Sequence, residues 1–161
     1  MNKNATSKTS RKKPKADPAH LDANTTPVMK SGMVAALGIS VTSLTAKKVT
    51  GEMKITPTHM NANGRVNGGA IMTFADVLGA VGAVANRPPG YRGGTIESKT
   101  NFFAAGVGPV LSAVCVPLHV GRTTSVWQTT IRNPDGAMVA MVTQTQIAVP
   151  AKTNGEQSAN A

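Results

Sequence analysis

The longest apolar stretch of the chain predicts a buried helix. Residues Gly68–Asn86 are mainly small and apolar, and the stretch is longer than strands usually are. Apolar residues occupy nearly every face of this helix, which is typical of a helix buried on all sides. Gly79 and Gly82 lie inside it, and each costs about 1 kcal/mol relative to alanine. We expect these glycines because a sheet approaches the helix backbone closely.

Stretches typical of strands lie on both sides of this helix. The tetrapeptide 133–136 has the proline and glycine of a hairpin turn, and the spacing of the later stretches predicts a four-strand antiparallel meander. A short helix over residues 27–37, capped by Thr26 and ended by Gly38, would come first. The predicted strands are 39–46, 49–55, 95–104, 109–119, 123–132 and 137–149. We therefore expect an α+β fold in which a curved antiparallel sheet wraps around one long central helix.

The two ends of the chain differ in composition from its centre. Residues 1–26 are mostly small, polar or basic, and Leu21 is their only large aliphatic residue after Met1. Such a segment cannot bury enough apolar surface to offset its ordering entropy. Residues 150–161 have a similar composition. We predict a disordered basic tail over residues 1–26, one domain over 27–149 and a disordered tail over 150–161.

Charge is concentrated at the N-terminus. The net charge is +10, and half of it lies in residues 1–30. This tail could bind nucleic acid or an anionic membrane surface, but it has no aromatic residue for base stacking. We favour a solvated tail and expect no nucleic-acid partner.

Cysteine content and hydropathy limit the classes of protein to which the chain could belong. Cys115 is the only cysteine, which excludes an intrachain disulfide and a multi-cysteine zinc site. No secretory signal is visible, and the longest apolar run, 71–85, is too short to span a bilayer and contains Asp76. We expect a cytoplasmic protein that has no membrane partner and needs neither metal nor cofactor.

Asp76 is the main candidate for chemistry. It is the only charged residue between Arg65 and Arg87, and a carboxylate in so apolar a stretch is costly unless it is paired or hydrogen-bonded. Gly68 lies eight residues earlier, where the first N–H groups of the helix have no intrahelical partner and can receive a developing oxyanion. The alternative is that the Asp76 carboxylate only forms hydrogen bonds with backbone groups of a loop.

The segment around this helix start resembles the PaaI-like branch of the hotdog-fold thioesterases. The pattern of that family is Asn, two residues, Gly, two residues, His-Gly-Gly, and then Asp or Glu on the helix. The residues in register here are Asn61, Gly64, Gly68, Gly69 and Asp76. Similar short motifs follow at residues 100–105, 121–122 and 135–136, so the resemblance covers about residues 30–149.

The resemblance implies hydrolysis of an acyl-CoA thioester to a free acid and CoA. Asp76 would be the nucleophile or general base, and the Gly68 N–H, with that of Gly69 beside it, would polarise the carbonyl. Family members assemble this site between subunits, so a homodimer or a dimer of dimers (a homotetramer) is implied. Ala80 would line the same face, and Arg122 could contact a CoA phosphate, although a solvated turn arginine is an equal alternative.

Two further positions bear on the activity. Asn61 could orient water or substrate, or it could be a turn residue only. Asn67 stands where the family usually has His; it keeps the ability to cap a helix but cannot act as a base. This departure leaves open a non-catalytic module that binds acyl-CoA, and it argues against a hotdog dehydratase, which needs the His.

Overall fold

The computed structural model describes residues 27–30 and 32–151. The predicted tails therefore lie outside the described residues, apart from Pro150 and Ala151. Thr26, the expected cap of the first helix, also lies outside them.

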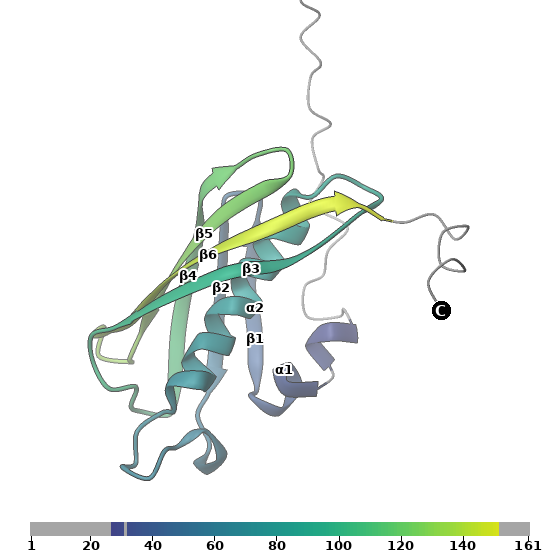
Figure 1. The fold of residues 1–161 in the computed structure, drawn as a ribbon. Coiled ribbons are helices and arrows are strands. Elements are labelled where there is room, and N and C mark those ends of the chain that lie inside the picture. The colour runs from purple at the N-terminus through teal and green to yellow at the C-terminus, as the bar shows by residue number, and fades with distance from the viewer. Residues whose placement is uncertain (1–26, 31, 152–161) are drawn as a thin grey trace, which may run out of the picture.

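Six antiparallel strands form one sheet that curves around a long helix (Figure 1). The helix α2 spans Gly68–Asn86, the bounds that the apolar pattern predicts. The strand order across the sheet is β1-β2-β4-β5-β6-β3. The strands are β1 (Ile39–Thr45), β2 (Lys48–Lys54), β3 (Tyr91–Phe102), β4 (Val110–Val120), β5 (Thr124–Arg132) and β6 (Met138–Pro150). The expected α+β architecture is confirmed.

The position of β3 corrects the predicted meander. Strands β4, β5 and β6 follow one another as expected, but β3 pairs with β6 at the edge of the sheet, and β2 takes the place beside β4. The cause is the connection after β3, which crosses the end of the sheet instead of turning back as a tight hairpin. The buried side chain of Asn133 holds it, because its amide accepts from Val107 N–H at 2.9 Å and donates to the Ala105 carbonyl at 3.0 Å.

Two other predicted boundaries also change. The segment before β1 is not one helix but a 3-10 turn, η2 (Pro27–Lys30), followed by a short helix, α1 (Gly32–Ala36). Gly38 follows it with a φ of 59°, which is consistent with the predicted glycine stop. Strand β3 begins at Tyr91 and not at residue 95 as predicted, because its pairing with β6 extends through Gly93 and Gly94.

Helix α2 lies very close to the sheet. A Cβ atom at Gly82 would lie 2.6 Å from Trp127 Cζ3, and one at Gly79 would lie 2.4 Å from the Gln144 side-chain carbon Cδ. Trp127 and Gln144 are both fully buried. The expected reason for these two helix glycines is therefore confirmed: they leave room for large side chains of β5 and β6.

The length and hydropathy of α2 would also allow it to cross a membrane. Half of its most apolar window, however, is buried inside this fold, and the core helices of folded domains have the same composition. The length and composition of α2 are therefore not sufficient evidence that it crosses a membrane.

We predict that Gly82→Ala destabilises the domain. The added methyl group would overlap the Trp127 ring, which cannot move freely because Nε1 also donates to Ser125 Oγ at 2.9 Å. Overpacking should lower the free energy of unfolding by about 1–3 kcal/mol, in spite of the better helix propensity of alanine. Urea unfolding measures this change.

Gly94→Ala is the matched control. No atom lies within 4 Å of a Cβ built at Gly94, so its stability should change by less than about 0.5 kcal/mol. A Gly82→Ala protein as stable as wild type would contradict the close packing of α2.

Candidate functional site

Asp76 lies at a cavity between the middle of α2 and the edge of the sheet. The cavity has a volume of about 280 Å³. One wall is formed by successive turns of the helix, and the other by β3 and β6. The lining includes Asp76, Ala80 and Arg87 on the helix side and Thr95 and Gln146 on the strands. Ala80 thus lines the same cavity as Asp76, one turn further along α2.

The carboxylate of Asp76 is held by two strands and not by a loop backbone. Thr95 Oγ1 donates to Asp76 Oδ1 at 2.7 Å, and Gln144 Nε2 donates to the same oxygen at 3.2 Å. Gln144 Nε2 also lies 3.3 Å from the Asp76 carbonyl oxygen. Asp76 is half-buried, so it is fixed from the sheet side and still reaches the cavity.

The start of α2 is capped by Asn67. Its side-chain oxygen accepts from Gly69 N–H at 2.7 Å, so the Gly69 N–H is already engaged. The Gly68 N–H donates to no group within residues 27–30 and 32–151. Of the two expected oxyanion donors, Gly68 is therefore the one that is available without breaking the cap. It also lies at the positive end of the helix dipole.

The other two predicted positions lie away from the carboxylate. Asn61 organises the turn before α2, because its side-chain oxygen accepts from Asn63 N–H at 2.9 Å and from Arg65 N–H at 3.2 Å. Arg122 is exposed in the β4–β5 turn. The carbonyl oxygen of the next residue, Thr123, accepts a hydrogen bond from the N–H of Ala148, and Ala148 lines the Asp76 cavity. Arg122 and Arg87 therefore lie toward the same end of this cavity.

A single chain keeps Asp76 apart from Gly68. The two residues are eight positions apart on one helix, which corresponds to about 12 Å along its axis. A second cavity of about 320 Å³ lies at the start of α2 and is lined by Asn67 and Gly69 together with apolar residues such as Met33 and Leu37, but not by Asp76. One chain thus presents a carboxylate at one place and a free helix N–H at another.

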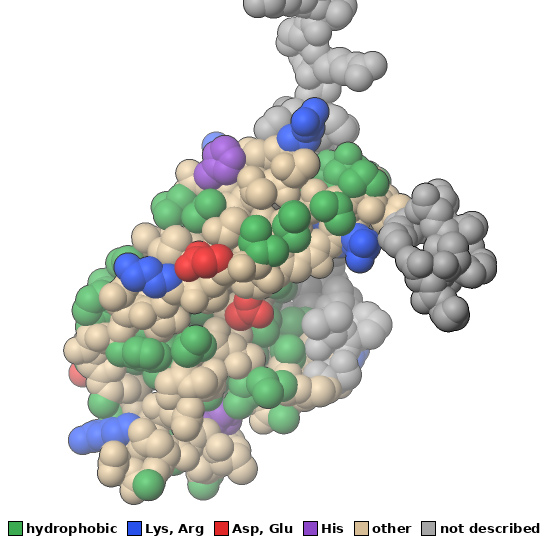
Figure 2. Space-filling view, in the orientation of Figure 1, with side chains coloured by type: hydrophobic (Ala, Val, Ile, Leu, Met, Phe, Trp, Pro, Cys, Tyr) green, Lys and Arg blue, Asp and Glu red, His purple; other side chains and the backbone are tan. Residues whose placement is uncertain are grey.

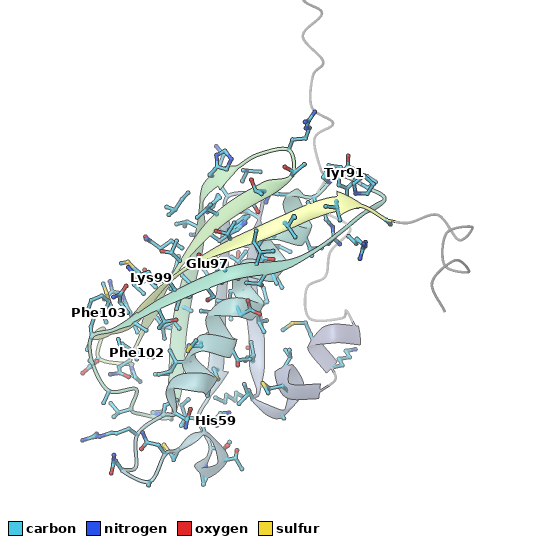
Figure 3. The ribbon with its side chains drawn as sticks, in the orientation of Figure 1. His59, Tyr91, Glu97, Lys99, Phe102 and Phe103 are labelled. Carbon is cyan, nitrogen blue, oxygen red and sulfur yellow. The ribbon has the colours of Figure 1, made fainter. Side chains whose placement is uncertain are left out.

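Neither His59 nor Cys115 replaces the missing histidine. His59 is buried below the start of α2 (Figure 3); its Nδ1 accepts from Thr56 N–H at 2.8 Å, so Nε2 carries the proton and donates to the Leu37 carbonyl at 3.1 Å. Burial raises the pKa of the Cys115 thiol to about 11, so it is protonated at neutral pH and is no nucleophile. Asp76 remains the reactive group best placed at a cavity.

Thr95, Gln144 and Gln146 surround Asp76 but are not predicted from the sequence. Thr95 lies on β3, and its contact with Asp76 depends on the pairing of β3 with β6, which the predicted meander does not contain. Gln144 contacts Asp76 directly from β6, and Gln146 contacts Thr95. One signal is present in the sequence: Gln144 and Gln146 lie on the same strand face as Ala140 and Val142, which are buried. Two amides on a core-facing side of a strand indicate a buried polar partner.

Comparison with known proteins shows which family the chain resembles. The model of the Thioesterase superfamily matches residues 63–140, from the loop before α2 into β6. A Vibrio cholerae protein with the name of an esterase is 26% identical over 112 residues, which is 70% of this chain and 75% of that protein. A Listeria monocytogenes protein named 1,4-dihydroxy-2-naphthoyl-CoA hydrolase is 23% identical over 97 residues, 60% of this chain and 79% of that protein.

Solved structures of several thioesterases share the fold of this chain. A thioesterase from Pseudomonas aeruginosa, solved as a mutant, has a TM-score of 0.75 and 25% identity and covers 88% of this chain and 98% of its own. A hypothetical thioesterase from Streptococcus pneumoniae, solved with coenzyme A, has a TM-score of 0.64 and 25% identity, with coverages of 71% and 88%. The PaaI protein of E. coli shares the fold with a TM-score of 0.70, at 21% identity and coverages of 84% and 93%. The chain therefore has the hotdog fold of these thioesterases, and its residues 63–140 match the Thioesterase superfamily.

Proposed function

We propose that this thioester hydrolase acts on acyl-CoA, with Asp76 as nucleophile or general base and the Gly68 N–H as oxyanion donor. The observation that carries the proposal is the half-buried Asp76 carboxylate, which the sheet holds through one oxygen at the wall of a cavity. Coenzyme A bound to the S. pneumoniae protein and the CoA hydrolase name of the Listeria relative favour a CoA thioester over other thioesters.

The chemistry needs only groups of the chain and water. As a base, Asp76 takes a proton from water, whose oxygen attacks the thioester carbonyl; the carbonyl oxygen becomes an oxyanion that the Gly68 N–H stabilises. The C–S bond then breaks, and the proton on Asp76 passes to the CoA sulfur. As a nucleophile, Asp76 would form an acyl anhydride and release CoA, and water would then hydrolyse the anhydride. Both routes need the ionised carboxylate.

A second copy of the chain would complete the site. In one chain Asp76 and Gly68 do not share a cavity, so the proposal needs the carboxylate of one subunit to meet the helix start of another. Strand β3 offers the surface for this pairing. It is an edge strand of twelve residues, and such a strand with unpaired backbone groups tends to recruit another strand.

The sequence of β3 suits pairing with its own copy. Glu97 and Lys99 flank Ser98 on this strand (Figure 3). In a two-fold antiparallel pair centred on Ser98, Glu97 of each copy faces Lys99 of the other. The exposed side chains of Ile96 (57% accessible) and Phe102 (50%) would be covered at the same time. Figure 2 shows hydrophobic side chains gathered around an adjoining acidic and basic pair along this edge.

Two arginines at one end of the cavity suit the phosphates of CoA. The side chain of Arg87 forms neither a hydrogen bond nor an ion pair with the rest of the described chain, and Arg122 is exposed nearby. A free guanidinium binds phosphate oxygens well, often through two parallel hydrogen bonds. The acyl group would then lie toward Asp76 and the nucleotide toward these arginines.

We predict that Asp76→Asn removes acyl-CoA hydrolysis. Wild type should release CoA from at least one class in a panel of short, medium, long and aryl acyl-CoAs, and the variant should lose about 10²-fold or more in kcat. The loss follows because an amide cannot take a proton or attack a carbonyl. Release of free CoA thiol, followed with a thiol reagent, measures the rate.

Asp135→Asn is the matched control. Asp135 is exposed in the β5–β6 turn, and its side-chain oxygen, which accepts from Ala137 N–H, is kept by asparagine. Full activity of an Asp76→Asn protein would contradict the proposal. Tight binding of acyl-CoA by calorimetry with no turnover in wild type would favour the binding module instead, with Asn67 in place of the family histidine as the reason.

We predict that reversing either charge of β3 weakens the dimer and that reversing both restores it. Glu97→Lys or Lys99→Glu alone creates two like-charge contacts across the two-fold axis, which should raise the dimer dissociation constant about tenfold or more. The double variant exchanges the two charges and restores opposite pairs. Sedimentation analysis over a range of concentrations measures the effect.

Lys47→Glu, in the β1–β2 turn far from β3 in the strand order, controls for the change in net charge. If the double variant dissociates as readily as the single variants, the pairing centred on Ser98 is wrong.

A further inference from the structure

The two oxygens of the Asp76 carboxylate have different surroundings. Thr95 Oγ1 and Gln144 Nε2 both donate to Oδ1, at 2.7 and 3.2 Å. Within the described ranges, Oδ2 accepts no hydrogen bond. The sheet therefore occupies one oxygen and leaves the other free to attack or to take a proton.

Neighbouring contacts fix the direction of this hydrogen-bond chain. Gln146 Nε2 donates to Thr95 Oγ1 at 2.7 Å, and its amide nitrogen can act only as a donor. The Thr95 hydroxyl must therefore direct its own proton to Asp76. The hydroxyl thus acts as a donor to the carboxylate and cannot take a proton from it in this arrangement.

Two features next to Asp76, the helix glycine Gly79 and the buried amide of Gln144, cost stability. Gly79 lies one turn after Asp76, and a Cβ there would lie 2.4–2.6 Å from three atoms of the Gln144 amide, so the glycine is what admits this side chain. Glycine costs about 1 kcal/mol in a helix interior. The fully buried Gln144 also leaves Oε1 without a hydrogen-bond partner in the described structure, which is a further cost of about 1–3 kcal/mol. The domain would be more stable with an apolar residue at position 144 and alanine at position 79. The arrangement therefore points to a functional requirement.

We infer that Thr95 and Gln144 are positioning residues that hold Asp76 through Oδ1 and make Oδ2 the reacting oxygen, with Gly79 as the opening that admits Gln144. This inference rests on the proposed role of Asp76 in hydrolysis. Neither residue needs to touch the substrate; both act through the rotamer of the carboxylate. A misplacement of about 1 Å in a reacting group can cost up to 10²-fold in rate.

The test compares three threonine variants with wild type in steady-state hydrolysis. Thr95→Val keeps the shape and removes the hydroxyl, and it should lower kcat about tenfold or more with KM within about twofold. Thr95→Ser keeps the hydroxyl and should recover most of the lost kcat. Thr143→Val is the control, because Thr143 lies next to Gln144 on the opposite face of β6 and makes no side-chain hydrogen bond in the described structure. It should behave as wild type.

A mutant cycle separates positioning from general damage. If Thr95 acts through Asp76 alone, Thr95→Val should cause no further loss in an Asp76→Ala background. An additional tenfold loss in that background would overturn the inference, and so would a Thr95→Val enzyme with the kcat of wild type. Both results leave the proposed function intact as long as Asp76→Asn is inactive.

An NMR measurement tests the same inference without turnover. The Hα–Hβ scalar couplings of Asp76 should report one χ1 rotamer in wild type and in Thr95→Ser, and averaged rotamers in Thr95→Val. A single rotamer in all three proteins would overturn the inference. If wild type hydrolyses no acyl-CoA, the proposed function fails, and these couplings still decide whether Thr95 holds the carboxylate.

Discussion

The close approach of α2 to the sheet is the constraint on which the rest of the structure depends. Glycine at position 82 lets the helix lie against Trp127, and glycine at position 79 lets it lie over Gln144. This spacing brings the backbone of α2 near enough for Asp76 to reach both Thr95 and Gln144. A helix displaced outward by larger residues would keep the fold class but would leave the carboxylate without partners from the strands.

The same packing explains why the chain carries its chemistry in two separate places. The middle of α2 presents Asp76 at the cavity along the edge of the sheet, while the Gly68 N–H lies at the start of the helix, outside the lining of that cavity. Asn67 fixes the helix start by capping Gly69, which is a structural task that histidine would perform less well. Asparagine there supplies no acid or base, so the proposed reaction depends on the carboxylate of Asp76 for proton transfer or attack.

The sequence predicts the fold well where the signal is local. The bounds of α2 follow from one long run of small apolar residues, and the turn at 133–136 follows from its proline and glycine. The place of β3 could not be predicted, because its pairing with β6 depends on how the crossing connection is held by Asn133, a long-range contact. The same limit applies to the site. Asp76 can be recognised as a lone charge in an apolar helix, but the contact of Thr95 with Asp76 requires the pairing of β3 with β6, which no local pattern predicts.

In the proposed site the carboxylate of one subunit works with the helix N–H of the other, and subunit complementation tests this arrangement most directly. Gly68→Pro removes the N–H and should keep the helix, because proline is favoured at the first helical position and Asn67, with φ −62° and ψ 136°, has the backbone that precedes proline. Gly68→Pro and Asp76→Asn should each be inactive alone. After exchange of subunits in an equal mixture, half of the dimers are mixed and each contains one intact site, so about a quarter of the wild-type activity should return. A mixture that has exchanged subunits and stays inactive would contradict the claim, because it would place both groups of each site in one chain.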